Sequence, residues 1–146
     1  MLKRIKMLKR ITCIILIVLI LSLLLNSCGY ILVKEKAYYK NADNYIEITG
    51  IIKYLKLKDN ELYFSVDSED THTIGVTFVI KGKNFKELKS IGFFDNTALD
   101  QTITFICAPE IMGDGYCPPV ASVLTENGFV PEKEEGINNI VKEHSL

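Results

Sequence analysis

Two cysteines late in the chain, Cys107 and Cys117, are the best-defined pair of residues that could do chemistry. Nine residues separate them, and the intervening APEIMGDGY contains a glycine-rich turn. Outside the cytoplasm such a pair is a candidate disulfide, provided that the two α-carbons come within about 7 Å. A turn centred on Gly113 and Asp114 would place position 107 opposite position 120, not 117. Two buried free thiols therefore remain the alternative, and the spacing does not match the C-x-x-C of a redox pair.

The histidines, His72 and His144, show no catalytic arrangement. Hydrolysis and group transfer need a nucleophile with a base, or paired acids. Neither histidine lies in a Ser/His/Asp or H-x-x-x-H pattern, and neither has a cysteine at metal-binding spacing. We expect both to be solvated surface side chains, and we predict neither an enzyme nor a bound cofactor.

Four side chains with metal-binding chemistry lie together in DSEDTH: Asp67, Glu69, Asp70 and His72. Their oxygens could hold a cation. The stretch lacks the ligand spacing and the glycine of an EF-hand loop. We therefore expect a solvated hairpin tip and no metal site.

The elements that must position these residues begin with three predicted strands, at 45–58, 61–68 and 72–82. All three are rich in β-branched and aromatic residues, and the second and third alternate between apolar and polar positions. Residues 59–60 and 69–71 are predicted turns. Gly50, inside the first strand, predicts a bulge or a sharp bend.

The pattern then changes to helical spacing and back. Phe85, Leu88 and Ile91 recur every three residues, which predicts a short helix that Asn84 caps and Gly92 ends. Two more strands are predicted at 101–109 and 117–125. Near the C-terminus, apolar residues at helical spacing predict a short docking helix: Ile137, Ile140 and Val141.

The order strand-strand-strand-helix-strand-strand resembles the OB-fold, a five-stranded Greek-key barrel. The long first strand with its glycine fits this family, as does Asp100 before QTITF, although Leu99 stands where the family often has glycine. The resemblance covers residues 44–130 and implies a mainly β, OB-like barrel. A small β-roll or an open meander with a flanking helix is the alternative.

The OB resemblance also implies where a ligand would bind, because the loop between the fourth and fifth strands borders the ligand face. The candidate binding face is then Tyr63, His72, Asp114 and Tyr116. The alternative is that residues 112–116 form an ordinary tight turn.

The first 28 residues have the pattern of an export signal. A basic head precedes an apolar run at 13–25, as in secretory signals. MLKRI occurs at both Met1 and Met7, so either methionine could be the start.

The end of this run resembles the lipobox of bacterial lipoproteins, with Leu25 at −3, Ser27 at −1 and Cys28 at +1; Asn26 at −2 departs from the pattern. The resemblance implies that Cys28 is cleaved, lipidated and anchored. The alternative is an uncleaved transmembrane helix over 11–33. Both interpretations place the rest of the chain on the outer, extracytoplasmic face of the cell membrane.

The charge is divided unevenly along the chain. Five of the 17 basic residues and none of the 18 acidic residues lie in 1–28, so the remainder has 12 basic and 18 acidic residues and a net charge of −6. Such a surface cannot rely on counterion release from nucleic acid.

We therefore predict four parts: a signal or anchor at 1–28, a tether at 29–43, the barrel at 44–131 and a tail with a short helix at 132–146. The combination is similar to uncharacterised small exported OB-like lipoproteins of low-GC Gram-positive bacteria, which implies no particular activity. The expected function is a membrane-anchored binding module that contacts an envelope protein or glycan. The alternatives are a single-stranded nucleic-acid-binding domain, to which a patch of lysines could contribute, and a small thiol or hydrolytic enzyme.

Overall fold

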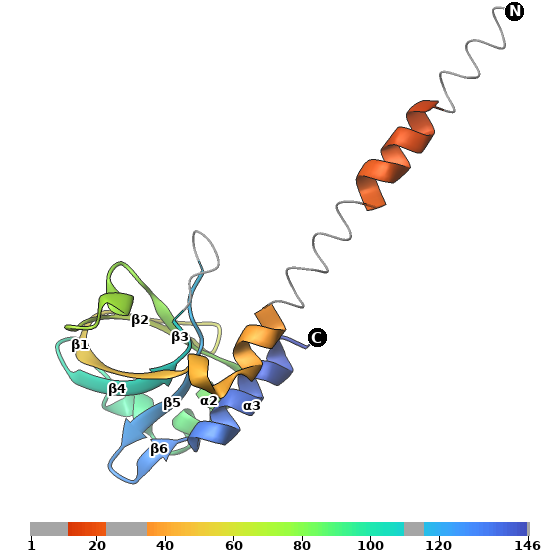
Figure 1. Ribbon diagram of the computed structural model, residues 1–146. Coiled ribbons are helices and arrows are strands. Elements are labelled where there is room, and N and C mark those ends of the chain that lie inside the picture. Colours follow the sequence, from red (N-terminus) through yellow and green to blue (C-terminus); the bar gives the residue numbers. More distant parts are fainter. Residues whose placement is uncertain (1–11, 23–34, 110–115, 146) are drawn as a thin grey trace, which may run out of the picture. The chain divides into compact units, whose positions relative to one another are not determined.

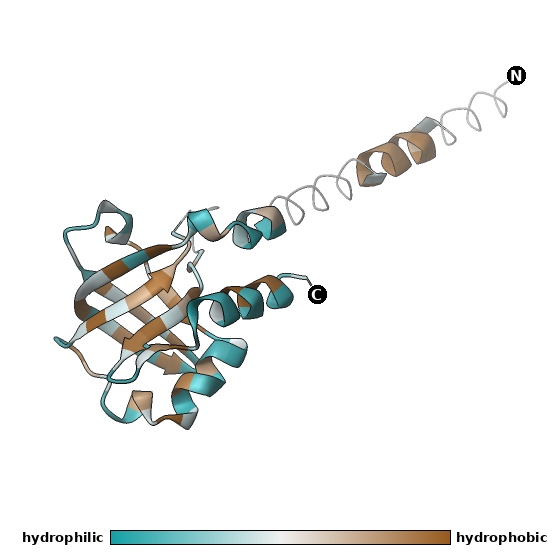
Figure 2. Ribbon diagram, turned by 60° about the horizontal axis from the view of Figure 1, so that its bottom comes forward, coloured by the Kyte–Doolittle hydropathy of each residue, from teal (hydrophilic) through white to brown (hydrophobic). Residues whose placement is uncertain are grey.

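The computed structural model describes residues 12–22, 35–109 and 116–145, and the chain divides into two compact units, Met1–Glu35 and Lys36–Leu146. In the first unit, residues 12–22 form a helix whose large apolar side chains are all at least half exposed (Figures 1 and 2). Within the described ranges, no helix combines the length and hydropathy needed to cross a bilayer.

The second unit is mainly β, as predicted, and is built on one antiparallel sheet of six strands in the order β3-β2-β1-β4-β5-β6 (Figure 1). The sheet is not closed, because its two edge strands, β3 and β6, do not pair with each other. An isolated parallel bridge joins Val79 of β3 to Pro119, and the Val79 N–H donates to the Pro118 carbonyl at 3.0 Å. The strands are β1 (Ile46–Lys58), β2 (Glu61–Asp67), β3 (Phe78–Ile80), β4 (Thr102–Cys107), β5 (Val120–Thr125) and β6 (Gly128–Val130).

The long strand β1 pairs with two neighbours, β4 along its first half and β2 along its second. Its register with β2 shifts between Ile52 and Tyr54, which is the irregularity that Gly50 predicted, displaced a little along the strand. Gly50 serves a different purpose, because a Cβ there would lie 2.8 Å from the Asp67 carbonyl oxygen. The glycine lets the two strands approach closely.

A two-residue turn joins β1 to β2, as predicted for positions 59–60. Asp59 and Asn60 have φ values of 52° and 60°, as a type I′ hairpin requires. The turn sets the register, so that Lys56 lies opposite Tyr63 and Lys58 opposite Glu61.

The predicted strand at 72–82 is wrong for its first half. Residues Thr71–Thr73 form a 3₁₀ turn, η2, because the Asp70 side chain accepts from the His72 backbone N–H at 2.9 Å. Gly75, at φ 69°, turns the chain again, so that β3 begins only at Phe78. Side-chain capping here outcompetes the ladder.

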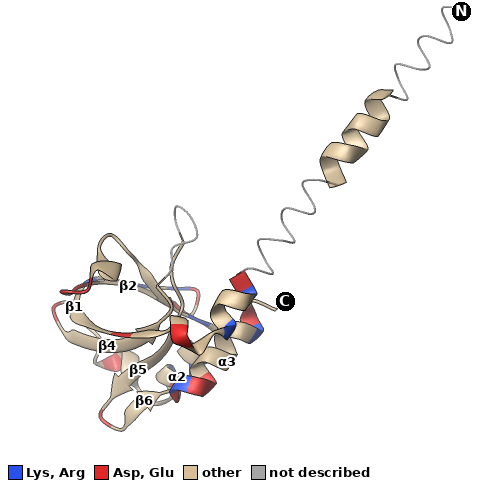
Figure 3. Ribbon diagram, in the orientation of Figure 1, with Lys and Arg blue, Asp and Glu red and all other residues tan. Residues whose placement is uncertain are grey.

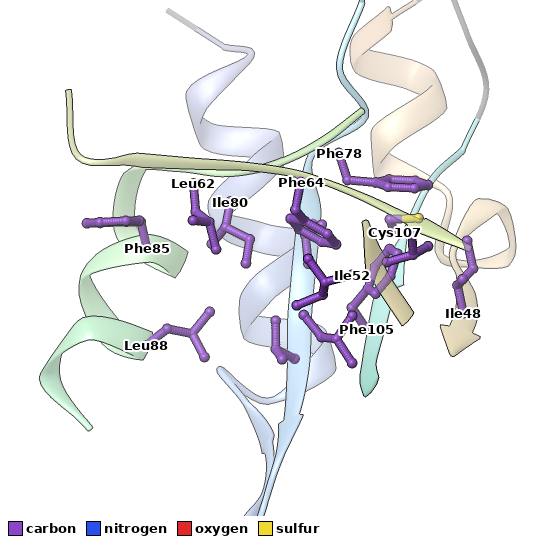
Figure 4. Packing of buried hydrophobic residues seen from close by; sticks show 14 of the residues in the cluster. Ile48, Ile52, Leu62, Phe64, Phe78, Ile80, Phe85, Leu88, Phe105 and Cys107 are labelled. Atoms are coloured by element: carbon purple, nitrogen blue, oxygen red, sulfur yellow. The ribbon is translucent and has the colours of Figure 1, made fainter. Parts of the chain in front are cut away.

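One hydrophobic core collects apolar side chains from the inner faces of β1 to β5 (Figure 4). Phe64, Phe78 and Phe105 meet at its centre with ring centroids 4.9–5.8 Å apart. Helix α2 (Gly82–Ser90) adds Phe85 and Leu88, as its spacing predicted. The chain leaves this helix through Gly92 at φ 73°.

A second core lies on the opposite face of β4 and β5, under helix α3 (Lys133–Glu143) and the helical residues 36–40. Ile137 and Ile140 are buried there, which confirms the predicted docking helix. Tyr39 is fully buried in the same cluster. Residues 36–43, predicted to be tether, therefore belong to the folded unit.

Asn84 does not cap α2, as the sequence predicted; Lys81 holds that position. The Asn84 side chain is instead buried. Its amide nitrogen donates to the carbonyls of Val120 and Gly136 at 3.2 and 3.1 Å, and its amide oxygen accepts from Asn139 at 2.8 Å. Asn84 thus ties α2 to β5 and α3.

Candidate functional site

A shallow hollow of about 390 Å³ lies on the outer face of β1 and β2. Tyr54, Lys56 and Lys58 reach it from β1, and Tyr63 reaches it from β2 across the hairpin. Thr77 and Cys117 complete the lining. Alternation along each strand places these side chains on the face opposite the phenylalanine core.

Two tyrosine rings give this surface apolar area and polar tips. Tyr54 is 43% exposed, and the Tyr63 hydroxyl donates to the Glu61 carboxylate. That hydrogen bond, with some burial, raises the pKa of Tyr63 to about 12. The hydrogen bond thereby helps to fix the position of the Tyr63 ring.

Two lysines, Lys56 and Lys58, bring positive charge to the same surface. Lys56 and Lys81 form no ion pair with any residue that the structure describes. Lys58 lies 3.9 Å from Asp59, but both side chains are largely exposed, so solvent screens this pair.

Lys81 lies close enough to Cys117 to lower the pKa of that thiol, which opposes the increase caused by burial. We call the surface formed by Tyr54, Lys56, Lys58 and Tyr63 the tyrosine–lysine face.

Cys107 and Cys117 form no disulfide with each other; Cys107 is buried and Cys117 is partly exposed, so the alternative of two buried thiols holds for Cys107 only. Cys107 pairs with Val120, the position that the turn geometry predicted, and its side chain is buried in the phenylalanine core. Cys117 instead lines the hollow on the outer face. Burial raises the pKa of both thiols, so neither is an activated thiolate.

We expect these two thiols to differ in reactivity. Brief exposure of the native protein to N-ethylmaleimide should label Cys117 well before Cys107, because only Cys117 is accessible. Peptide mapping by mass spectrometry measures both, and labelling in denaturant provides the control in which the two react alike. Equal native rates, or a peptide pair linked through Cys107 and Cys117, would contradict this arrangement.

His72 lies in η2, with its Nδ1 2.7 Å from the Asp70 carboxylate and 55% of its side chain exposed. It does not line the hollow that contains Tyr63. Hydrogen bonds from the His72 backbone and then its ring hold the pKa of Asp70 below its ordinary value. Within the described part of the chain, no three His, Cys, Asp or Glu side chains are grouped to hold a metal.

The lowered pKa of Asp70 predicts a pH-dependent contribution to stability. The cap is fully effective above the ordinary carboxyl range and is lost as the pH falls through the lower folded-state pKa. Asp70→Ala should therefore cost about 1 kcal/mol at neutral pH, with the difference from wild type shrinking in acid. Urea unfolding at several pH values measures this, and Asp70→Asn is the control that keeps an accepting oxygen without titrating. A difference that did not change with pH would contradict the prediction.

The other described residues of the predicted binding face do not gather around Tyr63. Tyr116 packs against the second core, and Asp114 and Cys28 lie outside the described residues. The prediction that His144 is a solvated surface side chain is wrong. Its ring centroid lies 4.5 Å from that of Tyr39, and its Nδ1 is 2.9 Å from the Ile140 carbonyl oxygen. Of the three described residues of the predicted binding face, Tyr63 alone lines this hollow.

The residues that the prediction missed were accessible from the sequence. A two-residue turn at 59–60 pairs position 58 with 61 and 56 with 63, so the outward residues of β1 follow by counting. Tyr54, Lys56 and Lys58 alternate as such a face requires. Cys117 and Thr77 could not be placed in this way, because they reach the hollow through tertiary contacts.

Comparison with known proteins identifies no relative: no protein-family model, no curated protein and no solved structure matches this chain. The function of the tyrosine–lysine face must therefore be argued from its own chemistry.

Proposed function

We propose that this chain is a membrane-tethered, extracytoplasmic binding module whose folded unit is an OB-like barrel. Three observations support the barrel: the order β1-β2-β3-α2-β4-β5, the shared strand β1 that pairs on both sides, and the parallel bridge from Val79 to Pro119. In this proposal β6 and α3 are additions to the five-stranded unit.

The N-terminal segment is the proposed tether. Its described helix, residues 12–22, exposes apolar side chains almost exclusively and carries no charge (Figure 3). We propose export followed by lipidation of Cys28, with an uncleaved anchor as the alternative. The intact mass of the membrane-extracted protein tests this: a chain that begins at Cys28 and carries acyl groups is expected, and an unmodified full-length chain found free in the cytosol would contradict it.

The tyrosine–lysine face carries the proposal that the module binds a ligand. Tyrosine rings next to exposed lysine amines suit an extended anionic partner, because the rings supply contact area at low entropic cost and the amines supply charge. We propose a negatively charged segment of an envelope glycan or protein. We propose binding over catalysis because burial raises the pKa of the Cys117 thiol that lines this hollow, which disfavours the nucleophilic thiolate.

Single-stranded nucleic acid is the second candidate, favoured by one observation. Tyr54 and Tyr63 on a basic face form the kind of stacking platform on which OB-folds hold bases. The net charge of −6 after Cys28 opposes it.

One titration separates the two candidates. Full-length protein in lipid nanodiscs is titrated with an oligogalacturonate and with a single-stranded oligothymidylate, at low and physiological salt. We expect saturable, salt-sensitive binding of the acidic saccharide and weaker binding of the oligonucleotide. Tight binding of the oligonucleotide alone would favour the second candidate, and binding of neither would remove the proposal.

Charge reversal then tests whether the face is responsible. Lys56→Glu should weaken binding of the acidic saccharide by about tenfold, because it replaces an attraction with a repulsion at the centre of the face. Lys142→Glu makes the same change on the exposed side of α3 and should leave binding as it is. Equal effects of the two changes would show nonspecific attraction.

A further inference from the structure

A larger hollow, of about 530 Å³, lies where β4 and β5 separate. Pairing between these strands covers only Phe105, Ile106 and Cys107 on β4. The preceding residues of β4 pair with β1 alone. The hollow is open on one side and is lined by the start of β4, the end of β5 with its turn into β6, the segment that follows α2, and Ile52 of β1.

The separation of the strands leaves backbone groups facing this hollow. In an antiparallel sheet, successive residues direct their N–H and C=O groups to alternate sides. At least one of Thr102, Ile103 and Thr104 therefore directs both groups toward the space that β5 has left. A ligand there meets a donor and an acceptor at fixed positions.

The side chains around these groups are mostly neutral and polar. Asn96, Thr102 and Asn127 line the hollow, and their side chains form no hydrogen bond with the residues that the structure describes. Gln101, Thr104 and Thr125 add further amide and hydroxyl groups. Glu126 is the one charged side chain in the lining.

The hollow also has exposed apolar surface. Ile91 is 51% exposed and Leu124 is 46% exposed, and both line it. Its volume is within the ordinary range for small-molecule sites, which is about 300–1,000 Å³. The lining thus combines unpaired neutral hydrogen-bonding groups with apolar patches.

We propose that this hollow binds a neutral saccharide. Sugar hydroxyls both donate and accept hydrogen bonds. They can therefore pair with the side-chain amides, the Thr102 hydroxyl and the backbone groups of β4 that face the hollow. The C–H faces of a sugar ring can lie on Ile91 and Leu124. Glu126 disfavours an anionic ligand, and the unpaired polar groups disfavour a purely apolar one. This site is separate from the tyrosine–lysine face and does not depend on the function proposed for that face.

Chemical-shift mapping with two probes, cellobiose and N,N′-diacetylchitobiose, tests the proposal on full-length protein in nanodiscs. We expect saturable, millimolar binding of at least one probe, with shifts confined to residues 91–104 and 124–127. Asn96→Ala should weaken that binding roughly fivefold through the loss of hydrogen bonds. The absence of saturable shifts with both probes, or shifts that map elsewhere, would overturn the proposal.

A blocking variant with a matched control makes the test independent of folding. Asn127→Arg places a long side chain at the mouth of the hollow from an exposed turn and should abolish saturable shifts. Asn138→Arg makes the same change on the exposed face of α3 and should bind as wild type does. Wild-type binding by Asn127→Arg would overturn the proposal. Both variants should still bind the oligogalacturonate, so failure of one site is distinguishable from failure of the other.

Discussion

Phe105→Ala is expected to reduce the free energy of unfolding by about 4 kcal/mol, within the range found when a buried phenylalanine is truncated. The Phe105 side chain is fully buried and contacts the rings of Phe64 and Phe78 at centroid distances of 5.1 and 4.9 Å. Its strand is held between β1 and β5, which limits how far the surroundings can close over the cavity. Urea unfolding followed by circular dichroism measures the loss.

Two comparisons make this result specific. Phe105→Leu preserves most of the volume and should cost less than about 2 kcal/mol. Phe129→Ala removes an equal ring from the half-buried strand β6 and should cost clearly less than Phe105→Ala. If the two alanine variants lost the same stability, the phenylalanine cluster would not be the centre of the core.

Gly136→Ala is expected to destabilise the protein by about 3 kcal/mol, although glycine-to-alanine changes inside helices ordinarily stabilise by up to about 1 kcal/mol. A Cβ at this position would lie 2.0 Å from the backbone oxygen of Ala121. That atom belongs to β5 and cannot rotate away, so α3 must move. Moving α3 also breaks the hydrogen bond from Asn84 to the Gly136 carbonyl.

Close packing of α3 on β5 predicts that Gly136→Ala lowers the stability, whereas helix propensity alone predicts that it raises the stability. Asn138→Ala, two residues further along α3 and exposed, should be neutral or slightly stabilising because alanine is the better helix former. Thermal unfolding of both variants beside wild type gives the comparison. A Gly136→Ala protein as stable as wild type would mean that α3 does not pack this closely on β5.

The hydrophobic pattern predicted local structure well wherever it was strong. The hairpin of β1 and β2, the apolar face of α2 and the docking face of α3 all follow from short-range spacing. The prediction failed at 72–77, where capping by Asp70 and the turn at Gly75 override alternation. It also missed β6, because three residues between a turn and Pro131 leave too short a pattern to recognise.

The candidate site shows the same division. Tyr63 was predicted, and its neighbours on β1 follow from the hairpin register. His72 and Tyr116 were grouped with Tyr63 by analogy between loops, and the structure instead places them in η2 and against the second core. The hollow at Thr102 and Asn127 has no motif in the sequence, because it exists only where two strands stop pairing.

By itself, the sequence determined the mainly β class, the β1–β2 hairpin with its polar outer face, and the apolar character of residues 12–22. These features depend on the periodic spacing of apolar residues and on the residues in the turns, both of which act between residues close in the chain. Only the tertiary structure decided that the second face of β4 and β5 is buried under α3, that Asn84 joins three elements, and that Cys107 and Cys117 point to different environments. Periodicity identifies which residues share a face, whereas the element that covers that face is selected by contacts between distant parts of the chain.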